Sequence, residues 1–151
     1  MDNYEINNNT IALIFNDYKT YIYEVDNFIV INKIPNNLIK YSCEYFGSSL
    51  KGRIEGTKYI TGITHKSPII IEETNEIVFF PTSSPRLDSC SWIRNKYVIK
   101  YEKIDSKSCY LYLINGRKIK INCSYETIDN QIMRSSRLES VIRYRKSVNF
   151  V

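Results

Sequence analysis

The 151-residue chain has little of what enzymes, membrane proteins and metal proteins need. No apolar run approaches the roughly 18 residues of a membrane-spanning helix, and the polar, acidic start at Met1–Glu5 predicts no signal peptide, as expected for a cytoplasmic protein. A Ser-His-Asp triad or a Cys-His pair would have to use the single histidine, His65. The Gly-x-Ser-x-Gly motif of a nucleophile elbow does not occur. Gly47 and Gly52 have phosphate-loop spacing, but an arginine and an isoleucine follow in place of Lys and Ser/Thr. We therefore predict that the chain is not an enzyme.

Cysteine is also scarce, and its spacing gives no sign of a metal site. The four cysteines form no Cys-x-x-Cys pair, so a zinc site would need distant ligands. In a chain without a signal peptide we expect reduced, small and mostly buried thiols. The sequence therefore predicts no metal and no cofactor.

Helix-favouring residues are rare, and strand-favouring residues are abundant. Ala and Leu total 8 residues, whereas Ile, Val and Thr total 39, of which 24 are Ile. The many Ile, Asn, Lys and Tyr residues are typical of a low-GC, bacterial genome. Because β-branched residues favour strands, the composition predicts a mainly β protein.

The order of patterns refines this prediction. Residues 10–15, 19–25 and 28–34 resemble strands of a meander with a turn at 26–27. A helix is expected near 37–46, with Asn36 or Asn37 as its cap, and glycines make the structure beyond it uncertain. Strand character returns over 59–103.

The clearest local pattern is Asn115-Gly116 between two apolar runs. It predicts a two-residue type I′ hairpin turn, with Ile119 opposite Tyr112 and Ile121 opposite Tyr110. Ser124 is expected to cap a C-terminal helix over about 125–144. We predict one α+β domain spanning 1–151, mainly antiparallel hairpins with two helical segments.

Charge is divided unevenly along the chain. Residues 1–50 carry 3 Lys/Arg and 6 Asp/Glu, a balance of −3, whereas residues 51–151 carry 18 and 10, a balance of +8. A basic C-terminal part indicates a polyanionic partner, and nucleic acid fits better than membrane because no basic amphipathic helix is apparent. A mildly basic surface that binds nothing is the alternative, and charge alone does not decide.

Residues 46–58 combine three glycines, three hydroxyl residues and three cations. Glycine lets backbone N–H groups approach a phosphate, and Ser, Thr, Lys and Arg add donors and charge. A solvated junction between a loop and a helix, which needs glycine only for its conformation, explains the same pattern.

A longer pattern in the chain resembles a known family. It runs Ser42-Cys43-x-x-Phe46-Gly47-Ser48-Ser49-x-x-Gly52-Arg53-x-x-Gly56-Thr57, Ile63-x-His65-Lys66-x-Pro68-Ile69, Phe80-Pro81-Thr82 with Arg86, Cys90-x-Trp92-Ile93, Asn115-Gly116-Arg117-Lys118, and Ser124-Tyr125 with Asn130-Gln131 and Arg134. These positions, in this order, resemble the bacterial competence transcription factor (ComK) family from about Tyr4 to Arg143. Ser91 departs from the family's glycine.

The resemblance implies a transcription activator of DNA-uptake genes. Such a protein binds paired A-rich and T-rich boxes of double-stranded DNA, mainly through the minor groove, as a homodimer or a dimer of dimers. An adaptor hands it to a Clp protease. Longer members continue past the position of Val151 with a charged tail that serves adaptor recognition, assembly and full activation, so we expect a short member in which these properties are questionable.

Donors suited to the acceptor-only minor groove of A·T pairs occur throughout the motifs. The candidate DNA-binding residues are Ser48, Ser49, Lys51, Gly52, Arg53, Lys58, His65, Lys66, Arg86, Arg134 and Arg137. For Arg86 a surface salt bridge is an equal alternative, and for His65 a hydrogen bond to a backbone carbonyl is slightly favoured.

The aromatic residues allow other interpretations. Trp92 fits the core better than a base-stacking platform, and Tyr97, Tyr101, Tyr110 and Tyr112 fit the core or a dimer contact. The alternative functions are a β-rich module that binds single-stranded nucleic acid through exposed tyrosines, and a short paralogue that sequesters the full-length activator.

Overall fold

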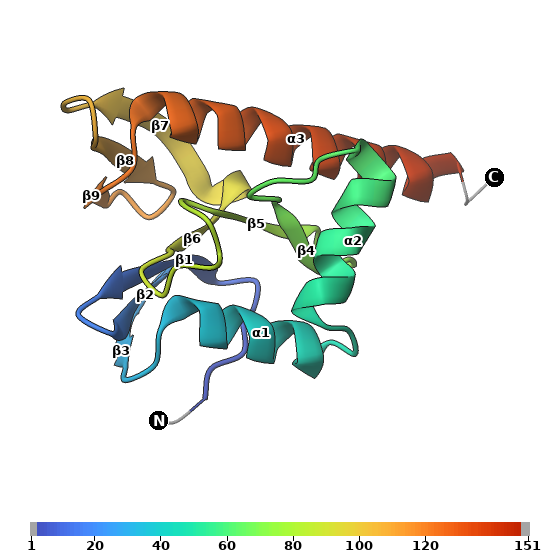
Figure 1. Cartoon of the computed structure of the whole chain (residues 1–151), viewed down its shortest axis with the longest axis horizontal. Coiled ribbons are helices and arrows are strands. Elements are labelled where there is room, and N and C mark those ends of the chain that lie inside the picture. The colour runs from blue at the N-terminus through green and yellow to red at the C-terminus, as the bar shows by residue number, and fades with distance from the viewer. Residues whose placement is uncertain (1–2, 149–151) are drawn as a thin grey trace.

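The computed structural model of the protein describes residues 3–148, which form two antiparallel sheets, three α-helices and one 3₁₀ helix (Figure 1). The larger sheet has the strand order β3-β2-β1-β6-β5-β4 and the smaller sheet β7-β8-β9. The elements are β1 (Thr10–Asn16), β2 (Lys19–Glu24), β3 (Phe28–Ile31), α1 (Pro35–Tyr45), α2 (Leu50–Thr61), β4 (Ile69–Glu72), β5 (Ile77–Pro81), β6 (Trp92–Arg94), η1 (Asn95–Tyr97), β7 (Val98–Lys103), β8 (Cys109–Leu113), β9 (Lys118–Ile121) and α3 (Tyr125–Val148). The predicted mainly β, α+β fold class is confirmed.

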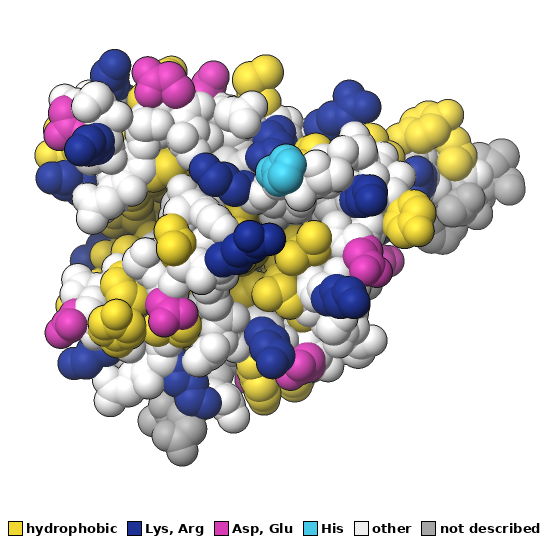
Figure 2. Space-filling view, in the orientation of Figure 1, with side chains coloured by type: hydrophobic (Ala, Val, Ile, Leu, Met, Phe, Trp, Pro, Cys, Tyr) yellow, Lys and Arg dark blue, Asp and Glu magenta, His cyan; other side chains and the backbone are white. Residues whose placement is uncertain are grey.

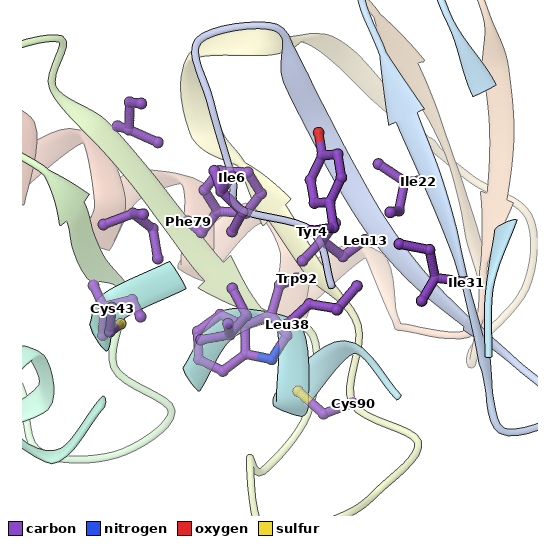
Figure 3. Close-up of a cluster of buried hydrophobic side chains, with 14 residues drawn as sticks. Tyr4, Ile6, Leu13, Ile22, Ile31, Leu38, Cys43, Phe79, Cys90 and Trp92 are labelled. Atoms are coloured by element: carbon purple, nitrogen blue, oxygen red, sulfur yellow. The ribbon is translucent and has the colours of Figure 1, made fainter. Parts of the chain in front are cut away.

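The larger sheet is covered on both faces. On one face, α1 and α2 bury a cluster that includes Leu13, Leu38, Phe79 and Trp92, all fully buried (Figure 3). On the other face, the smaller sheet packs against Ala12, Phe80 and Ile93 of the larger one. Trp92 therefore belongs to the core, as predicted.

Helix α3 joins the two sheets. Ile128 packs with the smaller sheet, and Leu138 and Ile142 pack against Ile70 and Val78 of the larger one. Figure 1 shows α3 running from the smaller sheet to a position beside α2. In the described part of the chain, no helix is both long enough and apolar enough to cross a membrane.

The β8–β9 hairpin differs from the prediction by one residue. Leu111 pairs with Ile119 and Cys109 with Ile121, and the Leu113 N–H donates to the Arg117 carbonyl at 2.8 Å. Three residues, Ile114-Asn115-Gly116, therefore form the loop, and only Gly116 has a positive φ, of 85°. The type I′ turn was wrong, because a three-residue loop with glycine in the left-handed position closes the hairpin instead. A one-residue shift exchanges the two faces of a strand, so the tyrosines lie opposite lysines and the apolar residues share the core face.

The helices also differ from the prediction. Helix α1 begins at Pro35, with Ile34 as an N-cap that makes no side-chain hydrogen bond, so Asn36 lies inside the first turn and caps nothing. Helix α2 occupies residues whose structure the glycines made uncertain, so residues 3–148 contain three α-helices rather than the two helical segments predicted. Its glycines each cost about 1 kcal/mol of helix propensity, which capping and the packing of Ile54 and Thr57 offset. In α3, the Ser124 hydroxyl accepts from the Thr127 N–H at 3.2 Å, as predicted for a cap.

All four cysteines are buried and free, as expected. Burial raises the pKa of Cys43, Cys109 and Cys123 from an ordinary 9.0 to about 11, and it raises the pKa of Cys90 as well. Among residues 3–148, no group of three or more His, Cys, Asp or Glu side chains lies close enough together to hold a metal ion.

Candidate nucleic-acid interface

The glycine- and serine-rich segment forms the junction between α1 and α2. Gly47 takes a φ of 83°, and the Ser49 hydroxyl accepts from the Gly52 N–H at 2.9 Å as the N-cap of α2. A Cβ on Gly52 would lie 3.1 Å from the Ser49 hydroxyl and 3.3 Å from that of Ser48, so glycine permits this close turn. The junction presents the positive end of the α2 dipole, although the Ser49 hydroxyl is already used by the cap.

Arg53 points inward from α2 rather than into solvent. Its side chain is 17% exposed, and its guanidinium lies 3.3 Å from the carboxylate of Glu73, in the turn between β4 and β5. The Arg53 Nε atom is buried without a hydrogen-bond partner among the described residues. The position therefore indicates that Arg53 fastens α2 to the sheet, and its predicted contact with DNA stays untested.

Arg134 is likewise occupied within the molecule. Its guanidinium donates to the His65 carbonyl and, at 2.7 Å, to the side-chain oxygen of Gln131. Burial lowers the pKa of Arg134. The bond to His65 holds the 62–68 loop against α3, and the bond to Gln131 fixes a neighbouring side chain of the same helix, so Arg134 supports the surrounding structure.

Gln131 completes this brace, and the sequence reasoning assigned it no role. It is 1% exposed, and its amide donates to the Lys66 carbonyl at 2.9 Å and to the Pro81 carbonyl at 2.8 Å. One side chain of α3 thus holds both the 62–68 loop and the C-terminal end of β5. The Asn130-Gln131 pair in the family-like pattern was the available signal.

The loop that carries Arg86 is held by α1, through the side chain of Asn36. The Asn36 amide donates to the carbonyls of Pro85 and Leu87 at 2.9 and 3.0 Å, and its oxygen accepts from the Trp92 indole N–H at 2.8 Å. Asn36 therefore fixes this loop to α1 and to the core, which explains why a residue expected to cap the helix lies within its first turn.

Between α2 and the two braced loops lies an open groove of about 470 Å³. Its lining brings together His65, Lys66 and Arg86, all three exposed, although Arg86 lies 20 residues beyond Lys66 in the sequence. Ser67 also lines the groove, but its hydroxyl is buried and has no hydrogen-bond partner among residues 3–148. The groove thus offers the cationic side chains of Lys66 and Arg86 to an anionic ligand.

The remaining predicted cations lie outside the lining of this groove. Lys51 and Lys58 are exposed on α2, Lys51 beside a second groove between α1 and α2, and Arg137 is exposed on α3. Figure 2 shows the single histidine, in cyan, with Lys and Arg side chains on several sides of it, over the region where α2, α3 and the loops meet. The structure thus places basic side chains on one face. Two of the predicted arginines, Arg53 and Arg134, make contacts within the protein that support this face.

Comparison with known proteins shows the family of the chain. The family model described as "ComK: ComK protein" matches residues 1–147. The curated competence transcription factor of Bacillus subtilis (strain 168) is 31% identical over 149 residues, covering 96% of this chain and 78% of that protein. No solved structure gives a significant match. The relative is a transcription factor and not an enzyme, in agreement with the sequence-based prediction, and the chain belongs to the ComK family.

Proposed function

We propose that this protein is a transcription activator of competence genes that binds paired A-rich and T-rich boxes of duplex DNA, mainly through the minor groove and as an oligomer. The observation that carries the proposal is the groove at which His65, Lys66 and Arg86 converge, each presented by a braced loop. Preorganised loops lose less conformational entropy on binding than mobile ones, so the bracing favours a functional surface over an incidental basic patch.

The chemistry of the groove suits A·T-rich DNA. The minor groove of A·T pairs presents only acceptors, and its narrow form in A-tracts has an enhanced negative potential that attracts inserted Arg or Lys. Arg86, at an exposed position in a loop supported by Asn36, is the candidate for insertion. Lys51, Lys58 and Arg137 would then contact phosphates on either side. A protein acting in this way works at the nucleoid, in the cytoplasm.

The test compares titrations of three duplexes at one fixed salt concentration. A duplex with spaced A- and T-tract boxes should bind more tightly than a G·C duplex of equal length. Replacing A·T by inosine·C in the boxes leaves the minor-groove face nearly unchanged, so binding should be largely retained. A major-groove reader would instead lose roughly 1–3 kcal/mol per contacted pair.

Substitutions connect this test to the groove. Lys66→Ala and Arg86→Ala should both weaken binding to the box duplex, and the Arg86 change should also reduce the preference over G·C. Equal affinity of wild type for both duplexes would refute sequence-specific binding. Loss on inosine·C as large as on G·C would refute the minor-groove mode. Mixed oligomers with a longer paralogue that bind no promoter DNA would favour sequestration instead.

A further inference from the structure

The smaller sheet has a second basic surface, remote in sequence from α2 and its loops. Strands β8 and β9 alternate strictly, with apolar residues buried and the intervening residues on the opposite, outer face. On that outer face Tyr112 pairs with Lys100 of β7 on one side and Lys118 of β9 on the other, and Tyr110 pairs with Lys120. The three lysines are exposed, and the tyrosines are half-buried. Tyr110 and Tyr112 are thus neither core residues nor covered by another element.

The tyrosine rings hold two of these lysines in place. The Lys118 ammonium lies 4.1 Å from the ring centre of Tyr110, and the Lys100 ammonium lies 4.5 Å from that of Tyr112. A cation within about 6 Å of an aromatic face is attracted by the ring quadrupole. Because a flexible lysine loses rotamer entropy when it is fixed, two lysines already restrained by rings are better prepared for an anionic partner than free ones.

Charge identifies the kind of partner. The outer face presents Lys100, Lys118 and Lys120 against two carboxylates, Glu102 on the same face and Asp105 in the loop after β7, whose charge interacts with that of Lys120. Lys118 and Lys120 also lie on the unpaired edge of β9. Lys118 and Lys120 are two residues apart on β9, about 6.8 Å along the strand, and Lys100 lies two strands away from Lys118, about 9.6 Å across the sheet. Such a set of ammonium groups is complementary to the phosphates of a nucleic-acid backbone. We propose that the outer face of β7-β8-β9 is a second DNA contact, which binds the phosphate backbone of duplex DNA.

Single-stranded nucleic acid fits this face less well. Base stacking needs an open aromatic face, whereas here ammonium groups lie over the tyrosine rings. The face therefore offers charge without an open stacking platform, which would contribute affinity and salt dependence without reading sequence. This inference rests on the proposed DNA binding of the chain, and it adds a contact that none of the predicted site residues supplies.

The test measures the salt dependence of duplex binding. Each phosphate contact contributes about 0.9 to the slope of log K against log salt concentration. The double variant Lys100→Ala/Lys118→Ala should therefore reduce that slope by about 1.8 and leave the preference for the A/T-box duplex over the G·C duplex unchanged. The matched control is Lys19→Ala/Lys33→Ala, which removes the same charge at the start of β2 and just after β3 in the larger sheet and should leave the slope near that of wild type.

Each outcome separates the inference from the proposed function. If wild type binds no duplex, the proposed function fails and this inference fails with it. If wild type binds and the Lys100/Lys118 variant keeps the wild-type slope, or loses no more than the control, the second contact is refuted while the function stands. A loss confined to single-stranded DNA of equal length would refute the duplex as the partner. Circular dichroism and thermal melting verify that both variants are folded.

Discussion

Replacing Gln131 by methionine should separate support of the DNA-binding face from contact with DNA. Methionine has a similar length but no amide, so the change removes the donors to the Lys66 and Pro81 carbonyls and the acceptor for Arg134. Two neutral hydrogen bonds are worth about 0.5–1.5 kcal/mol each, and a buried carbonyl left without a donor costs about 1–3 kcal/mol. The bond from Arg134 adds little, because that guanidinium is only partly buried and finds water. We expect the free energy of unfolding to fall by about 2–4 kcal/mol.

Urea unfolding measures this loss directly. With a slope of about 2 kcal/mol per molar urea, the midpoint should fall by about 1–2 M. The control is Asn130→Ala, the exposed neighbour on α3, which should change stability by less than about 0.5 kcal/mol. In DNA titrations, Gln131→Met should lower the affinity while keeping the salt slope, since every cation remains and only loop order is lost. A stability change as small as the control's would refute the bracing role.

Three further measurements test other parts of the structure. Arg94 is fully buried and donates to the Asn8 backbone and side chain and to the Asn75 carbonyl. Because hydrogen bonds from a charged group contribute about 1.5–3 kcal/mol each and removing the guanidinium also relieves its burial, Arg94→Met should cost about 3–5 kcal/mol in urea unfolding, and a cost below about 1 kcal/mol would contradict its role. Asn36→Asp keeps the acceptor for the indole N–H but loses both loop donors, so DNA affinity should fall while Trp92 fluorescence stays near wild type; a shifted emission would mean that the core itself has changed. The third measurement concerns Cys43, Cys109 and Cys123, whose pKa values burial raises. Such a thiol keeps its proton in the native state while the unfolded chain loses it, so the free energy of unfolding should fall between pH 9 and 11 by about 1.4 kcal/mol per pH unit per thiol. A free energy of unfolding that stays constant over this range would count against burial of the three cysteines.

The hairpin register shows which part of the fold the sequence could predict. Strand character and the Asn-Gly turn placed β8 and β9 correctly, but a two-residue and a three-residue loop both contain that dipeptide. The alternation itself distinguishes the two, because only the longer loop brings Leu111 and Ile119 to the same face. The register was therefore predictable from burial, although the turn motif alone pointed to the wrong one.

The candidate site was less predictable because it depends on partners distant in the sequence. Residue type places Arg53 and Arg134 among cations that bind phosphate, yet Arg53 lies beside Glu73, and Arg134 donates to the backbone carbonyl of His65. Neither partner follows from local spacing. By contrast, the convergence of His65, Lys66 and Arg86 was suggested only by the order of motifs shared with the family, which the tertiary structure places around one groove.

The central pairing of the larger sheet has a consequence for how the protein forms during synthesis. Strand β1 pairs with β2 on one edge and with β6 on the other. The pairing with β6 forms only late in synthesis, because Ala12 pairs with Ile93, 81 residues further along the chain. At about 5–20 residues per second, the ribosome takes about 4–16 s to make that stretch. During this time one edge of the β1–β3 meander lacks its partner, and an unpaired edge can join a neighbouring chain. Slower translation before β6 should therefore lower the soluble yield more than an equal delay after α3 has been made.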